Sequence, residues 1–144
     1  MIPAWREPVR DEWIDYNGHL SEAYYVLVFG NATDAVLEYV GLGEEYREAR
    51  DSSLYTVEAH VRYLAEVPGG AELEVRSTVI GATGKLLRVW HEMWLDDSLR
   101  ATEEVLGLHV TGRRSSPFPA DVAERIATEM TEPGEDAGRA IGDI

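Results

Sequence analysis

The chain has 144 residues, of which 44% are apolar, and it carries a formal net charge of −14 at pH 7. This composition fits one globular domain and excludes a disordered chain, while the excess of acidic residues disfavours a nucleic acid partner. The absence of cysteine excludes disulfides and thiolate metal sites. Apolar runs are too short for a membrane span and the charged N-terminus lacks an export signal, so we expect a cytoplasmic protein.

The first predicted elements are a short strand within residues 8–15 and a long helix that begins at Glu22 and ends near residue 40. Apolar residues recur at helical spacing in this segment, Ser21 is a good N-cap, and Gly41 begins the stop signal. The helix is apolar over most of its circumference, which predicts that other structure wraps it.

Four long stretches of alternating apolar and polar residues follow a charged connector: 53–67, 71–83, 85–97 and 99–111. The alternation predicts β-strands, and the short turns between them predict an antiparallel meander. Because the strands are longer than usual, the sheet should be strongly curved. In the first stretch, strict alternation places Tyr55, Val57 and Tyr63 on one face and Glu58 on the other.

Together these elements predict an α+β fold in which a curved antiparallel sheet wraps a long central helix, an arrangement that resembles the hotdog fold. We expect a single domain over residues 1–130 and a flexible, acidic, Gly-rich tail over residues 131–144. An unpaired edge strand in such a small sheet exposes backbone N–H and C=O groups that can pair with another chain. We therefore expect a twofold homodimer that covers a sheet edge.

The segment DYNGHLSEAYY, residues 15–25, contains the strongest candidate site. Asp15, Asn17 and His19 stand at alternate positions before the helix, and Gly18 allows a positive φ. A helix N-terminus offers free N–H groups that stabilise an oxyanion, and a carboxylate beside it acts as nucleophile or general base. The same residues also form a strong turn sequence, so residue types alone leave catalysis and a plain turn both open.

The longer segment WIDYNGHLSEAYYVLVF closely resembles the signature that opens the central helix of hotdog-fold acyl-CoA thioesterases of the 4-hydroxybenzoyl-CoA thioesterase type. Asp15 matches the catalytic acid of that family, and Gly18 matches its glycine. The Asp-x-Asn-x-His spacing is also similar to the catalytic stretch of plant acyl-ACP thioesterases, which implies catalytic roles for Asn17 and His19. The resemblance spans residues 5–118. It implies an acyl-CoA substrate, no metal or cofactor, and a homodimer with the active site at its interface.

One position departs from these relatives, because Ser21 and Glu22 stand where they often carry asparagine. The resemblance implies that a backbone N–H near either residue is the oxyanion donor, which a side-chain change need not abolish. A narrower similarity, in residues 13–19, 55–64 and 108–119, is to the betainyl-CoA thioesterases of carnitine degradation. Their substrate ends in a trimethylammonium group, which needs an aromatic box or a nearby acid.

The candidates for that substrate pocket are four aromatic residues and one acid: Tyr24, Tyr25, Tyr63, Trp90 and Glu58. Core packing explains most of the aromatic residues equally well. An acid in the middle of a strand is costly if it is buried without a partner. Glu58 therefore either faces the substrate or pairs with a neighbouring His or Arg.

Basic residues beside glycines are candidates for binding the phosphates of CoA: Lys85, Arg88, Arg113 and Arg114. In the thioesterases that this chain resembles, basic residues of this region serve that purpose, although solvated turn residues are the alternative. The four histidines are scattered over separate elements without ligand spacing, so no metal site is expected.

Three hypotheses follow for the function. The first is an acyl-CoA thioesterase that hydrolyses a small acyl-CoA, with betainyl-CoA as the specific candidate and either a dimer or a tetramer as the assembly. The second is a hotdog acyl-CoA hydratase or dehydratase, which is disfavoured because those enzymes carry Pro after the Asp and His five positions on. Here His19 follows Asp15 by four positions without a proline. The third is a non-catalytic acyl-CoA binding module.

Overall fold

The structure is a computed structural model that describes residues 1–142. Its elements in chain order are β1 (Trp5–Pro8), η1 (Asp11–Trp13), α1 (Glu22–Val40), α2 (Glu44–Arg50), β2 (Ser52–Tyr63), β3 (Glu72–Ala82), β4 (Leu86–Leu95), β5 (Ser98–Thr111), β6 (Arg114–Ser115) and α3 (Ala120–Glu129). The first strand is earlier than the predicted range, and the chain forms a short 3-10 helix within that range instead.

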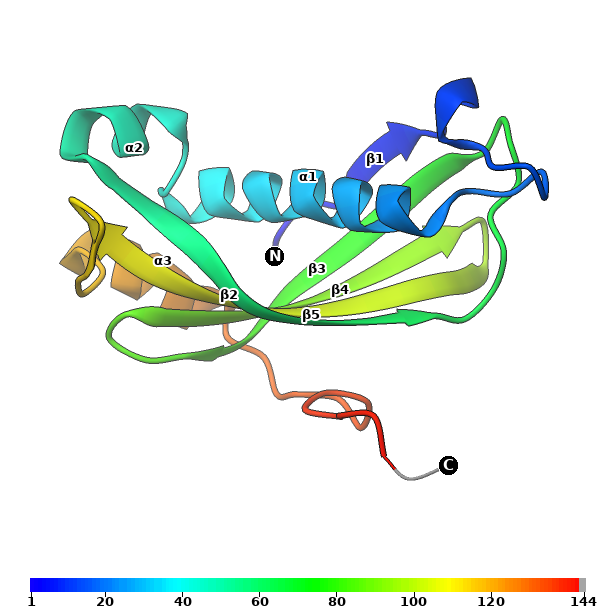
Figure 1. The fold of residues 1–144 in the computed structure, drawn as a ribbon. Coiled ribbons are helices and arrows are strands. Elements are labelled where there is room, and N and C mark those ends of the chain that lie inside the picture. Colours follow the sequence, from blue (N-terminus) through cyan, green and yellow to red (C-terminus); the bar gives the residue numbers. More distant parts are fainter. Residues whose placement is uncertain (143–144) are drawn as a thin grey trace.

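The strands form one antiparallel sheet in the order β1-β3-β4-β5-β2, with β6 paired to the end of β5. The sheet curls around α1, which lies along its concave side (Figure 1). The predicted α+β class and helix-wrapping sheet are therefore confirmed. The predicted meander order was wrong for β2, which pairs with β5 and not with β3. Short turns force β3, β4 and β5 to be neighbours, whereas the longer connection over residues 64–71 lets the chain cross to the far edge.

The long helix α1 is buried on the side that faces the sheet. Its inward side chains join two adjoining core clusters, one near each end of the helix, and they are Tyr25, Val28, Phe29, Ala32, Val36, Leu37 and Val40. Gly41 ends the helix in the left-handed region with a φ of 93°. The opposite side of the helix still shows apolar residues to solvent, because Val26 and Leu27 are each 44% exposed.

A β-bulge interrupts β2 between Thr56 and Glu58, where the register with β5 shifts by one residue. The extra residue switches which side chains face the helix. Leu54 and Thr56 line the concave side together with Ala59, and Tyr63 packs against Tyr25 of α1 on that same side. Tyr55 lies on the opposite face, so the prediction that Tyr55 and Tyr63 share one face was wrong. Sequence alternation alone cannot reveal a β-bulge, because the bulge depends on pairing with a strand that is distant in the sequence.

The described part of the C-terminal tail lies on the other side of the sheet from α1 (Figure 1). Thr131 donates its backbone N–H to the carbonyl of Val79 at 2.8 Å, and Asp136 lies 3.4 Å from the guanidinium of Arg62. Part of the segment that we expected to be flexible is thus in contact with the sheet. The mobility of that segment stays a prediction. Within residues 1–142, no helix is long and apolar enough to cross a membrane.

Candidate active site

The segment before α1 folds into a tight turn at one end of the sheet. The Ser21 N–H donates to the Trp13 carbonyl at 3.0 Å, and the Asp15 N–H donates to the His19 carbonyl at 2.9 Å. Gly18 closes the turn with a φ of 79°, a conformation that favours glycine. This short ladder pairs Asp15 with His19, two residues before Ser21, which directly precedes α1.

The carboxylate of Asp15 is half-buried and accepts a hydrogen bond from the backbone N–H of Asn17 at 2.9 Å. An Asp side chain commonly stabilises a turn through such a bond, so Asp15 does have the structural role that the plain-turn interpretation predicts. The hydrogen bond from Asn17 uses one lone pair of one carboxylate oxygen of Asp15, and the other lone pairs stay free to act as nucleophile or to accept a proton. Tyr16, at the tip of the turn, is 97% exposed and covers nothing in the described structure.

The N-terminus of α1 carries free backbone donors beside this turn. No side chain caps the helix, since the hydroxyl of Ser21 makes no cap hydrogen bond. Within residues 1–142, the N–H groups of Glu22 and Ala23 have no acceptor, whereas the N–H of Ser21 is used by Trp13. Of the two oxyanion donors considered from the sequence, the one at Glu22 is therefore available and the one at Ser21 is not. The helix dipole adds positive potential at the same place.

The side chains of His19 and Asn17 make no hydrogen bond to the Asp15 carboxylate within residues 1–142, and Asn17 contacts it only through its backbone N–H. The Nε2 atom of His19 lies 3.1 Å from a carboxylate oxygen of Glu66, and Asn17 is exposed. Both residues border the site and are open to solvent on one side. Their catalytic roles stay predictions that follow from the family resemblance.

A groove of about 670 Å³ runs along the outward side of α1, between the helix and the strands β2 and β5. Its lining residues are Ala23, Val26, Leu27, Gly30, Asn31, Thr33, Asp34, Leu37, Leu54, Thr56, Ala59, Glu103 and Val105. It begins at the first turn of α1, next to the free N–H groups. This continuity makes the groove the natural place for a group attached to a carbonyl that sits at the helix N-terminus.

The predicted pocket residues do not lie together in one place, and none of them lines this groove. Tyr24 stacks on the ring of Trp13 at 5.5 Å, and Tyr25 is buried with its hydroxyl donating to a backbone carbonyl. Tyr63 packs edge-on against Tyr25 and places its hydroxyl 3.4 Å from the Glu22 carbonyl, which is beside the site. Burial raises the pKa of Tyr25 and of Tyr63.

Trp90 and Glu58 lie on the convex side of the sheet, away from α1. Trp90 alternates with buried residues that face the helix and donates its indole N–H to Glu92 at 3.2 Å. Glu58 lines a separate hollow together with Arg88 and Glu104. The period-two alternation of β4 already placed Trp90 on the face opposite His91, whereas the bulge in β2 was not visible in the sequence.

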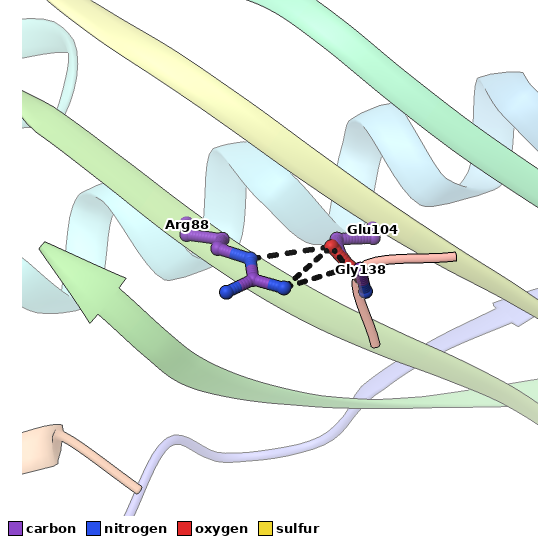
Figure 2. Close-up of polar contacts among 3 residues, drawn as sticks. All are labelled: Arg88, Glu104 and Gly138. Carbon is purple, nitrogen blue, oxygen red and sulfur yellow. Dashed lines mark hydrogen bonds and ion pairs between the residues drawn. The ribbon is translucent and has the colours of Figure 1, made fainter. Parts of the chain in front are cut away.

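The four predicted CoA-binding bases do not form one group. Arg88 forms an ion pair with Glu104 at 3.0 Å, and the same carboxylate accepts the backbone N–H of Gly138 (Figure 2). Lys85, Arg113 and Arg114 are exposed near the turns that follow β3 and β5. These turns lie at the opposite end of the sheet from Asp15, and β5 alone separates its two ends by about 40 Å. Within one chain, they therefore cannot bind a molecule that reaches Asp15.

The groove contains an acidic residue, Glu103, that is not among the site residues predicted from the sequence. Glu103 on β5 is only 4% exposed and lines the groove, and no hydrogen bond to its carboxyl group is found within residues 1–142. Its oxygens are not among the fully enclosed polar atoms without a partner, so they open onto the groove. Burial raises its pKa to about 7. A signal was present in the sequence, because alternation along β5 puts Glu103 on the same face as the apolar residues Ala101 and Val105. No cluster of three or more potential metal ligands occurs among residues 1–142.

Comparisons with known proteins identify the family of this chain. Residues 9–126 match the family model of the thioesterase-like superfamily. The chain is 40% identical, over 152 residues, to a betainyl-CoA thioesterase of Pseudomonas aeruginosa, and the match covers 99% of this chain and 95% of that protein. It is also 47% identical, over 103 residues, to an L-carnitine dehydrogenase/betainyl-CoA thioesterase of Agrobacterium fabrum, covering 71% of this chain and 21% of that longer protein.

Among solved structures, a Staphylococcus aureus protein in complex with CoA superposes with a TM-score of 0.90 and 26% sequence identity, over 98% of this chain and 94% of that one. The fold, the Asp15 turn and the family model lead to the same assignment. The chain belongs to the thioesterase-like superfamily and has the hotdog fold.

Proposed function

We propose that this protein hydrolyses an acyl-CoA thioester, with Asp15 as the reacting carboxylate and betainyl-CoA as the substrate. The observation that carries the proposal is the half-buried Asp15 carboxylate in the turn that leads directly into the free N–H groups at the start of α1. The substrate is inferred from the betainyl-CoA thioesterase that is 40% identical over nearly the whole chain.

The proposed reaction starts with the thioester carbonyl at the N-terminus of α1. The N–H of Glu22 donates to the carbonyl oxygen and stabilises the negative charge that forms there on attack. Asp15 either attacks the carbonyl carbon itself or removes a proton from the attacking water. If Asp15 attacks, the carbon–sulfur bond breaks to give a mixed anhydride on Asp15, which water then hydrolyses to the free acyl carboxylate and Asp15. If water attacks, the carbon–sulfur bond breaks and gives the acyl carboxylate directly. In both routes CoA leaves as its thiol after protonation. The reaction needs water and no metal or cofactor.

We further propose a twofold dimer built on the free edge of β2. No strand among residues 1–142 pairs with that edge, which exposes the apolar residues Tyr55, Val57 and Tyr63. Antiparallel pairing of two copies puts the start of β2 in one chain beside its end in the other. The exposed bases near the β3 and β5 turns of one protomer then approach the Asp15 turn of its partner. This arrangement supplies CoA contacts that a single chain does not offer.

The dimer predicts a mass of twice 16.1 kDa in solution, measured by light scattering. Changing Val57→Lys places a charge on the proposed interface and should yield monomers with strongly reduced thioesterase activity. Ile141→Lys is the matched control, because Ile141 is an exposed apolar residue of the tail. A wild-type protein that is monomeric and fully active would rule out this interface.

The proposed activity is tested by incubating the protein with betainyl-CoA and a panel of short acyl-CoAs and detecting free CoA with a thiol reagent. Thiol release is expected, most rapidly from betainyl-CoA, and Asp15→Ala should abolish it. Absence of thiol release from every substrate would refute the proposal, and an enoyl product would indicate a hydratase. The cytoplasmic location and a further pairing of dimers into tetramers stay predictions.

A further inference from the structure

The groove along α1 has a glycine in its lining, Gly30. Gly30 sits within the helix, where Gly costs roughly 1 kcal/mol relative to Ala. A Cβ atom built on Gly30 would meet no atom within 4 Å, so packing inside the chain does not explain the absence of a side chain. The position instead keeps space free above the helix, within the groove.

The charges in the groove have one sign. Its lining contains two carboxyl groups, those of Asp34 and Glu103, and it contains no Lys, Arg or His. Asp34 is exposed at the rim, whereas Glu103 lies deep, between the helix and the sheet. The apolar walls come from Val26, Leu27 and Leu37. A group that fits these features is apolar on its surface and positively charged.

Glu103 has no internal partner for its charge. His91 faces it in the register between β4 and β5, but both ring nitrogens of His91 are occupied. The Thr33 hydroxyl donates to the Phe29 carbonyl, so it accepts from the Nε2–H of His91 at 2.8 Å, and Nδ1 accepts from the Ser77 hydroxyl at 2.7 Å. This arrangement fixes a neutral ring, and burial lowers the pKa of His91 to about 3.

A buried carboxyl group without a hydrogen-bond partner or a countercharge is costly to fold, so a bound cation would offset that cost. A metal ion does not suit the site, because hard cations take six or more oxygen ligands and no such cluster exists among residues 1–142. A primary ammonium group also fits poorly, since it seeks several acceptors. A quaternary ammonium has no N–H group and is surrounded by methyl groups, so one carboxylate and apolar walls satisfy it.

We infer that Glu103 is the specificity-determining countercharge for a quaternary ammonium on the acyl group, with Asp34 adding negative potential at the rim of the groove. The inference rests on the proposed function, because it assigns a site to the acyl end of the same substrate. The thioester carbonyl lies at the first turn of α1, and the charged end extends along the helix toward Gly30. Specificity then comes from a carboxylate and does not require an aromatic box.

The test compares betainyl-CoA with 3,3-dimethylbutyryl-CoA, in which carbon replaces the quaternary nitrogen and the shape is unchanged. The ratio of kcat/KM values for the two substrates is measured for the wild type, Glu103→Gln and Asp34→Asn. Glu92→Gln is the matched control, because Glu92 lies on the convex face of β4, next to His91. Folding of each variant is checked by its unfolding midpoint.

We expect Glu103→Gln to lower kcat/KM for betainyl-CoA about 100-fold, because loss of one partner leaves the other charge buried and unpaired. Hydrolysis of the neutral analogue should change little, while Asp34→Asn lowers the preference less and Glu92→Gln leaves it intact. If the wild type prefers betainyl-CoA and Glu103→Gln keeps that preference, the inference fails while the proposed function stands. If the wild type hydrolyses neither compound nor any other acyl-CoA, the proposed function itself fails.

Discussion

Replacing Asp15 with Asn is expected to lower kcat for acyl-CoA hydrolysis about 1,000-fold while changing KM little. The side-chain oxygen of Asn still accepts the backbone N–H of Asn17, so the turn that precedes α1 is preserved. The amide neither attacks a carbonyl efficiently nor accepts a proton from water. The loss therefore falls on the chemical step, and steady-state kinetics with thiol detection measures it.

Asp11→Asn provides the matched control for this variant, because Asp11 is an exposed acid a few residues upstream in the same segment. Its kcat should stay within a factor of two of the wild type. An Asp15→Asn protein with full kcat would exclude Asp15 from the reaction. If the kcat and the unfolding midpoint of Asp15→Asn fell together, Asp15 would be needed to stabilise the turn and not for the reaction.

Replacing Glu103 with Gln is expected to change how the stability of the protein depends on pH. Burial raises the pKa of Glu103 from 4.5 to about 7, so between these values the folded state keeps a proton that the unfolded state has lost. The unfolded state binds fewer protons in this window, and the free energy of unfolding therefore falls as pH rises. The difference in pKa corresponds to about 3 kcal/mol by pH 8.

Urea unfolding of both proteins between pH 4.5 and pH 8 measures this effect. The stability of Glu103→Gln relative to the wild type should rise by about 3 kcal/mol across that range. The groups around Glu103, which are His91, Tyr63 and Asp34, are present in both proteins, so their own titration largely cancels in the difference. Parallel pH profiles would show that Glu103 does not carry a raised pKa. Glu92→Gln, on the convex face, should follow the wild type.

The turn that holds Asp15 was predictable from the sequence because its determinants are local. Asp15, Gly18 and the start of α1 lie within eight residues, and turn and capping preferences act over that distance. The long helix, the strongly alternating strands and the α+β class were predictable for the same reason. The family model and the relatives then confirmed the resemblance that these residues carried.

The groove beside α1 was not predictable in this way, because its lining residues come from α1, β2 and β5. Tyr24, Tyr25, Trp90 and Glu58 have suitable chemistry, but packing and a bulge direct them elsewhere. Glu103 was detectable by its alternation with buried residues. However, the sequence did not show that both ring nitrogens of the facing His91 are already used.

The sequence by itself determined the fold class, the turn that holds Asp15 and the acidic character of the molecule. The tertiary structure alone decided the strand order, which places β2 at an edge, and the face on which each β2 side chain lies. It also decided that Glu103 is buried in the groove that Gly30 lines, where no basic residue among residues 1–142 pairs with it. The physical reason is distance along the chain: local preferences set turns and helices, whereas strand pairing, bulges and burial depend on residues far apart in sequence.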